Sequence, residues 1–209
     1  MVALLFGCAL CGYAWVYLPR QMQQWQRKSL QAFARAIELR TQGRFGHSEP
    51  MAQFAQLVAR QLGLSAWRRH QLELAIYLRD IGMVAIPYAI LNKREPLTAV
   101  EEVTLARHAE IGAAIVEQIP LLHTLAPLVR LHHVRYCEQP DAPLEAHLLA
   151  ALSTLFEVSK QEGLDAALER LKQQVGRGYH PKVIAAIEAC LSPTRTSALE
   201  EMQRSAALW

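Results

Sequence analysis

Signals that begin and end helices recur along this chain, whereas no stretch alternates apolar and polar residues long enough to predict a strand. The clearest signal is the segment 98–101, where Thr98 and Glu101 form the T-x-x-E pattern of a capping box. Ser48 and Ser65 each precede an apolar run that they can cap, and Pro181 suits the first position of a helix. These features predict an all-α fold.

Length and composition favour one helical domain with a short appendage. The chain has 209 residues, of which 52% are hydrophobic and 20% are charged, so a disordered or collagen-like protein is excluded. The helical domain is expected over 46–192, before a loosely held tail at 193–209. Periodicity and Gly or Pro breaks predict helices over 21–44, 48–62, 65–80, 98–118, after 127 to about 136, 146–161, 164–175 and 181–191, with a loop or short turn over 81–92.

The N-terminal segment 1–19 contains no charged residue, and its length is close to the ~20 residues that cross a hydrocarbon core. Trp15 and Tyr17 lie near its end, where aromatic rings favour the headgroup zone. The pattern predicts a transmembrane anchor over 1–19, with the lipid bilayer as its partner, followed by a juxtamembrane helix over 20–45. A cleaved signal peptide, a lipoprotein signal and a buried core helix are the alternatives.

Basic residues dominate the segment after this anchor, since Glu38 is its only acid, and they are Arg20, Arg27, Lys28, Arg35, Arg40 and Arg44. By the positive-inside rule, the helical domain would therefore lie in the cytoplasm. A nucleic-acid partner is not expected, because the net charge is only +3 and anionic lipid explains a basic segment beside a span.

Five residues with metal-binding side chains are drawn from four expected helices, and they are His47, Asp80, His108, His132 and His133. Ligands from several helices can converge on the axis of a bundle, and imidazole with carboxylate suits Fe, Mn or Zn. The remaining histidines are interpreted as surface or hydrogen-bonded residues, and they are His70, His123, His147 and His180. The expected cofactor is either none or a single divalent metal ion.

These candidates lie in stretches that resemble the HD-GYP family, a branch of the HD superfamily of metal-dependent phosphohydrolases. The resemblance covers 29–192 in order, and its stretches are GHSE (46–49), YLRDIGMVAIP (77–87), ILNK (90–93), PLT (96–98), RHAEIGA (107–113), LAP (125–127), HHVRY (132–136) and YHP (179–181). It implies a helical bundle that hydrolyses cyclic di-GMP with two or three metal ions. It also places all five candidates at ligand positions of the family.

The chain departs from this family pattern inside the expected site. Arg79 stands where the family has the histidine of its His-Asp pair, and an arginine has no lone pair to offer a metal. Arg79 is expected either to enter the pocket and pair with Asp80 or Glu157, or to point to solvent. Met83 replaces a lysine, while Thr154 or Ser153 stands where a later helix supplies an aspartate.

The segment after the His-His pair is also altered. The residues Val134, Cys137 and Glu138 replace a glutamate, an aspartate and a glycine of the family, and the Gly-Tyr-Pro loop is missing. Such losses weaken a metal site, because each ligand depends on its neighbours for support.

Two hypotheses about function follow from this combination. The first is a catalytically degenerate HD-GYP-like protein, anchored in the bacterial inner membrane by a single span, that binds a signalling protein or a second copy of itself. The second is an active metal-dependent phosphohydrolase, a cyclic di-GMP phosphodiesterase with a reduced metal site that uses Asp80.

Overall fold

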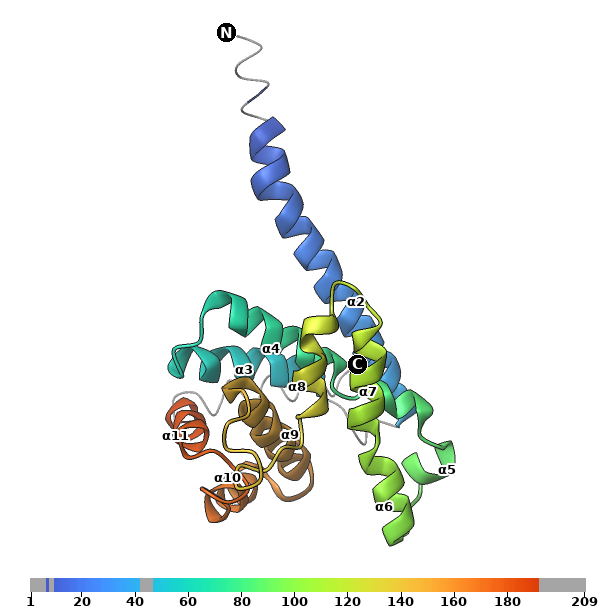
Figure 1. Ribbon diagram of the computed structural model, residues 1–209. Coiled ribbons are helices and arrows are strands. Elements are labelled where there is room, and N and C mark those ends of the chain that lie inside the picture. Colours follow the sequence, from blue (N-terminus) through green and yellow to red (C-terminus); the bar gives the residue numbers. More distant parts are fainter. Residues whose placement is uncertain (1–6, 8–9, 42–46, 192–209) are drawn as a thin grey trace.

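The computed structural model describes residues 7, 10–41 and 47–191, and it shows an all-helical protein (Figure 1). No strand occurs within these ranges, where the only β-type pairing is an isolated bridge between Val175 and Tyr179. The predicted all-α class is therefore confirmed. Residues 42–46 and 192–209 lie outside the described part of the chain. They include both expected domain boundaries, at 45/46 and 192/193, and the expected tail at 193–209.

The described chain contains α-helices of very different lengths, joined by turns and loops. The α-helices are α2 (Leu18–Arg40), α3 (Ser48–Gln61), α4 (Ala66–Leu78), α5 (Tyr88–Leu91), α6 (Ala99–Ala106), α7 (His108–Glu117), α8 (Ala126–Arg130), α9 (Leu144–Glu162), α10 (Leu164–Gln173) and α11 (Pro181–Cys190). A π-helical turn, η1 (Tyr13–Tyr17), precedes α2, and two 3-10 turns, η2 (Ile81–Ala85) and η3 (His123–Leu125), lie between helices.

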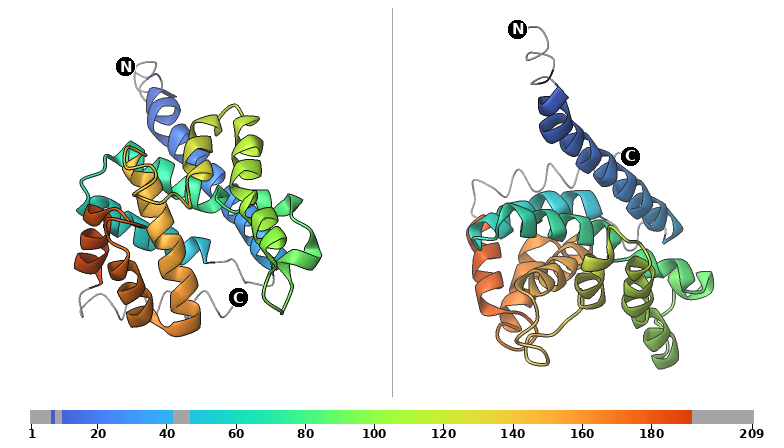
Figure 2. Two further views of the ribbon diagram at one scale, coloured as in Figure 1. Left: turned by 60° about the horizontal axis from the view of Figure 1, so that its bottom comes forward. Right: turned by 45° about the horizontal axis from the view of Figure 1, so that its top comes forward.

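The main core lies where α3, α4, α9 and α11 pack together (Figure 2). Phe54 of α3 and Phe156 of α9 meet in this core with ring centroids 6.4 Å apart. Burying each such side chain stabilises the fold by about 1.5–3 kcal/mol. Leu30 and Ala34 of α2 join the same core, so the C-terminal half of α2 is packed against the domain.

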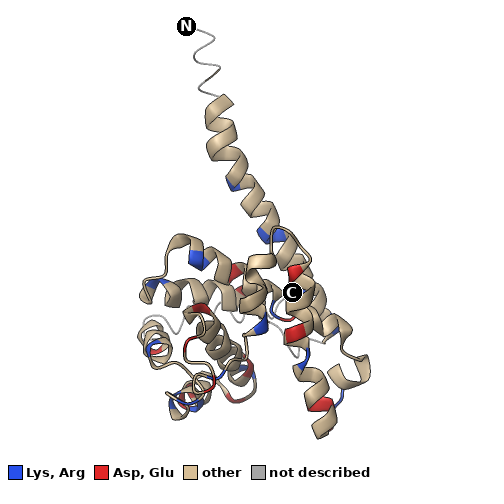
Figure 3. Ribbon diagram, viewed as in Figure 1, with Lys and Arg blue, Asp and Glu red and all other residues tan. Residues whose placement is uncertain are grey.

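The predicted transmembrane anchor over 1–19 is not supported by the described part of the structure. Among the described residues, no helix combines the length and the apolar character that a membrane crossing requires. The apolar residues of η1 run directly into α2, which carries basic residues from Arg20 onward (Figure 3). Residues 1–6, 8 and 9 lie outside the described part of the chain. The single-pass inner-membrane location that rested on this anchor is contradicted by the same finding.

Two of the predicted helix caps are confirmed. The Ser65 hydroxyl accepts a hydrogen bond from the backbone N–H of Arg68, and Thr98 and Glu101 form both bonds of a capping box. Ser48, by contrast, is the first residue of α3 rather than its cap. The Ser48 N–H donates to a carboxylate oxygen of Glu38 at 3.0 Å, so the end of α2 caps the start of α3.

Two expected helices end earlier than predicted, and both early ends place histidines at the positions that later form the candidate site. The expected helix 98–118 is broken at Arg107, so that His108 begins α7. The expected helix after Pro127 ends at Arg130 rather than near 136, so His132 and His133 follow the helix in a turn.

An ion pair between α4 and α9 gives a stability prediction. Arg68 donates from Nε and Nη2 to both carboxylate oxygens of Glu145, which is buried, and this bond raises the pKa of Arg68. Arg68→Ala would leave a buried carboxylate without its partner and is expected to lower the free energy of unfolding by about 1–3 kcal/mol. Urea unfolding measures the loss, and Arg177→Ala, at an exposed position, is the control. Equal stability of both variants would contradict the account.

Candidate metal centre

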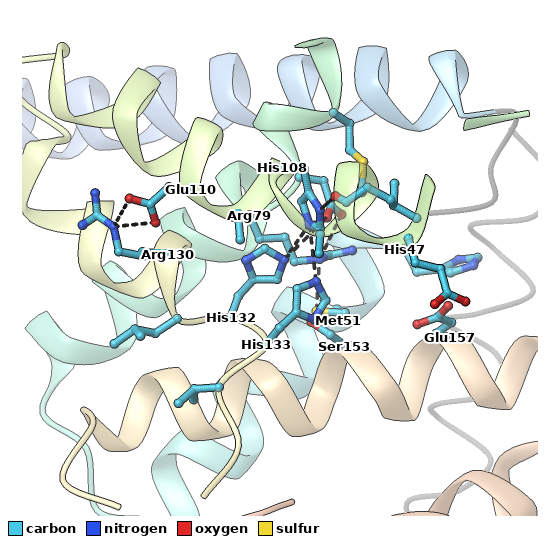
Figure 4. A pocket seen from close by; sticks show the side chains of 18 of the residues that line it. His47, Met51, Arg79, His108, Glu110, Arg130, His132, His133, Ser153 and Glu157 are labelled. Atoms are coloured by element: carbon cyan, nitrogen blue, oxygen red, sulfur yellow. Dashed lines mark hydrogen bonds and ion pairs between the residues drawn. The ribbon is translucent and has the colours of Figure 1, made fainter. Parts of the chain in front are cut away.

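Three imidazole rings meet at one side of the helical core (Figure 4). His108 comes from the start of α7, and His132 and His133 come from the turn after α8. One potential ligand atom from each residue lies within 4.8 Å of the other two. The closest pairs are Nε2 of His108 with Nε2 of His132 at 3.0 Å and with Nε2 of His133 at 3.3 Å.

Backbone carbonyls fix the tautomer of two of these rings. Nδ1 of His108 lies 2.6 Å from the Leu105 carbonyl oxygen, and Nδ1 of His132 lies 2.6 Å from the Val129 carbonyl oxygen. Because a carbonyl only accepts, each Nδ1 carries the proton and donates. In a neutral ring the lone pair is then on Nε2, so the Nε2 atoms of His108 and His132 present lone pairs to each other.

Two of the rings, those of His132 and His133, are also held in their neutral form. Burial, with His133 and His108 nearby, lowers the pKa of His132 well below its usual value. Desolvation and the neighbouring His108 lower the pKa of His133 to about 4. At neutral pH these histidines are therefore lone-pair donors, the form in which imidazole binds a metal.

The donor set fits a single divalent cation. Two imidazole nitrogens that each bind one metal at about 2.1 Å are separated by roughly 3.0–3.4 Å when the angle at the metal is between octahedral and tetrahedral. The two Nε2–Nε2 distances fall in this range. A cation between these lone pairs would relieve their mutual repulsion, so the residues present match the expectation of one divalent metal.

Asp80 lies beside this histidine cluster, at the start of η2. Its Oδ1 is 3.8 Å from Nε2 of His108 and 4.0 Å from Nε2 of His132. Its other oxygen, Oδ2, pairs with Nε of Arg79 at 3.1 Å. The expectation that Arg79 enters the pocket and pairs with Asp80 is confirmed, and the alternative that it points to solvent is wrong, since Arg79 is buried.

The structure does not bring His47 into the cluster. This residue precedes α3 with a left-handed backbone (φ 88°), and its side chain lies across the pocket near Glu157 (Figure 4). Its buried Nε2 has no hydrogen-bond partner among the described residues. Burial, together with nearby Lys160, lowers the pKa of His47, so this ring also presents a neutral nitrogen.

The other altered positions divide between the pocket and its surroundings. Ser153 rather than Thr154 faces the pocket, because the Thr154 hydroxyl accepts a hydrogen bond from Tyr179 at 2.8 Å. Met83 is buried with Ile86 and Leu91 in a small separate core and also borders the pocket.

The segment that follows the paired histidines turns away from them after a few residues. Val134 and Glu138 border the pocket, whereas Cys137 is exposed and donates its backbone N–H to the Arg177 carbonyl. Tyr136 similarly bonds to the Gly178 carbonyl, so this segment is tied to the loop before α11.

Sequence reasoning missed Met51 and Lys160. Met51 of α3 contacts Arg79, whose Nη1 lies 3.3 Å from the Met51 sulfur. Lys160 lines the pocket together with Ser153 and Glu157 of the same helix. Their spacing of i, i+4 and i+7 places them on one face of α9 and was the available signal for Lys160.

Comparison with known proteins identifies relatives of this chain. A family model described as HD domain matches residues 31–183. The chain is 34% identical over 183 residues to "Cyclic di-GMP phosphodiesterase response regulator RpfG" of Xanthomonas campestris pv. campestris (strain 8004), an alignment that covers 80% of this chain and 48% of that protein.

Two further relatives carry related descriptions. The chain is 33% identical over 102 residues to "3'3'-cGAMP-specific phosphodiesterase 3" of Vibrio cholerae serotype O1, which covers 49% of this chain and 22% of that protein. It is 26% identical over 157 residues to "Cyclic di-GMP phosphodiesterase" of Thermotoga maritima, which covers 67% of this chain and 42% of that protein. The chain thus spans less than half the length of each of these curated relatives.

Proposed function

Because the chain belongs to the HD domain family, we propose that it is a metal-dependent phosphohydrolase that cleaves a cyclic dinucleotide at a single-metal site. The observation that carries this proposal is the convergence of three imidazoles beside the Asp80 carboxylate. His108, His132, His133 and Asp80 would hold the metal, and Fe, Mn or Zn suits these donors.

A bound divalent metal would polarise a phosphoryl oxygen and make water a stronger nucleophile. The chain itself supplies the arrangement around that chemistry. The Leu105 and Val129 carbonyls fix the orientation of His108 and His132, and burial keeps the His132 ring neutral by lowering its pKa. Asp80 provides the negative charge that a cationic centre requires.

The class of substrate rests on the relatives and on the size of the pocket. The curated relatives act on cyclic di-GMP or 3'3'-cGAMP, according to their descriptions. The pocket beside the histidines has a volume of about 730 Å³, which is within the usual range for a nucleotide-sized ligand. Both observations support a cyclic dinucleotide such as cyclic di-GMP.

A second candidate function is binding without turnover. The Arg79–Asp80 ion pair favours this second function. Asp80 is the only carboxylate beside the histidine cluster among the described residues, and Arg79 already engages one of its two oxygens. In that case the domain would bind its ligand and pass the signal to a protein partner or to a second copy of the chain.

Hydrolysis of cyclic di-GMP by the full chain separates the two candidates. The protein, purified and reconstituted anaerobically with Fe²⁺ or with Mn²⁺, is expected to release a linear product, and EDTA is expected to stop this release. Asp80→Asn, which keeps the size of the side chain but removes its charge, is expected to lower the rate by about 100-fold. Binding of cyclic di-GMP with no product under either metal would favour the second candidate and contradict the first.

A further inference from the structure

Arg79 is a buried cation whose hydrogen bonds are only partly used. Its Nε pairs with Asp80, and its Nη1 contacts the Met51 sulfur at 3.3 Å and the Ile76 carbonyl at 3.2 Å. Its Nη2 has no hydrogen-bond partner within the described ranges. Only 5% of Arg79 is exposed, so the guanidinium is held at a fixed place by α3, by α4 and by Asp80.

The unused edge of this guanidinium borders the pocket that also contains the histidine cluster. The Nη2 atom has no partner yet keeps some contact with solvent, so a ligand in the pocket can reach it. Among natural acceptors, a phosphate oxygen matches the planar fork of arginine best, and the resulting bond is charge-assisted.

We propose that Arg79 binds a phosphate group of the ligand directly, beside the metal position and on the other side of Asp80. Asp80 then links two cationic positions, with Oδ1 toward the histidine cluster and Oδ2 on the guanidinium. This inference deepens the proposed function, and the choice of a phosphodiester as the ligand rests on that function. The contact between the Arg79 guanidinium and the phosphate does not require the metal.

A second arginine of the same pocket shows why Arg79 is singled out. Arg130 also borders the pocket, but its Nε pairs with Glu110 at 3.0 Å and its Nη2 with Glu117 at 2.9 Å. Two carboxylates thus neutralise Arg130 and occupy its Nε and Nη2 donors. Arg130 is therefore a matched control, a guanidinium in the same pocket that is not expected to bind phosphate.

The test measures anion binding by the full chain in EDTA, where turnover cannot occur. Isothermal titration calorimetry with inorganic phosphate and with cyclic di-GMP gives the dissociation constants. Wild-type protein is expected to bind both, and Arg79→Met is expected to bind both about 10- to 100-fold more weakly. Arg79→Lys, which keeps the charge but loses the fork, is expected to be intermediate, and Arg130→Met is expected to stay within about twofold of wild type.

The outcomes separate this inference from the proposed function. A wild-type protein that binds phosphate through Arg79 but hydrolyses nothing would leave the inference standing and overturn the proposed function. Unchanged binding in Arg79→Met and Arg79→Lys would overturn the inference, even if the enzyme is active. If Arg79→Met does not fold, Arg79→Lys decides, and failure of wild-type protein to bind either anion also overturns the inference.

Discussion

Replacing His132 with alanine is expected to abolish metal retention and to lower phosphodiester hydrolysis by about 100-fold or more. His132 is fully buried, and its Nε2 is 3.0 Å from that of His108, so it is the most enclosed member of the cluster. Its loss would leave two imidazoles and a carboxylate that is already paired with Arg79. Metal content after gel filtration, measured by mass spectrometry, checks the first part of this prediction.

His123→Ala is the matched control for this experiment. The Nδ1 of His123 bonds to the Pro120 carbonyl three residues earlier, the same arrangement that orients His132, but His123 is exposed. This variant is expected to keep wild-type metal content and activity. Circular dichroism establishes that both variants are folded. Wild-type metal content in a folded His132→Ala protein would contradict the proposed centre.

Replacing Gly82 with alanine is expected to lower the free energy of unfolding by about 3 kcal/mol or more and to disturb the centre. Gly82 is in η2, two residues after Asp80, and it packs against the start of α7. An added Cβ would lie 2.0 Å from the His108 carbonyl oxygen and 2.6 Å from the Gly112 nitrogen. Because both are backbone atoms, the clash can be relieved only by moving η2 away from α7, which separates Asp80 from His108.

Gly112→Ala measures the same contact from the other side. Its added Cβ would lie 3.2 Å from the Gly82 nitrogen and 3.2 Å from a methyl carbon of Val129. The helix-forming advantage of alanine offsets this milder crowding, so stability should change by no more than about 1 kcal/mol. Urea unfolding and metal content of both variants test the contrast. Equal stability of the two proteins would show that the η2–α7 contact is not as tight as described.

Local sequence signals predicted much of the helical framework. Ser65 and the Thr98–Glu101 capping box mark helix starts correctly, because a capping bond forms between residues only three apart. The family resemblance, which the matched HD domain supports, placed His47, Asp80, His108, His132 and His133 in one site, and the structure clusters the last three with Asp80 beside them and leaves His47 apart.

What the sequence did not predict depends on contacts between distant segments. The orientation of Arg79 is set partly by Met51, which is 28 residues away on another helix. The early end of α8 carries no glycine signal, and the His132 side chain instead bonds to the Val129 carbonyl at that end. The membrane prediction rested on the length, apolar composition and flanking residues of the segment 1–19, whereas no helix among the described residues is long and apolar enough to cross a membrane.

The most direct test of the proposed centre is a crystal structure of the full chain grown with Mn²⁺, with anomalous diffraction data collected at the manganese edge. We expect one anomalous peak, bonded to Nε2 of His108, His132 and His133 and to Asp80, with Arg79 still on the other oxygen of that carboxylate. No peak at the histidines, or a second manganese in place of the Arg79 guanidinium beside Asp80, would contradict a single-metal centre.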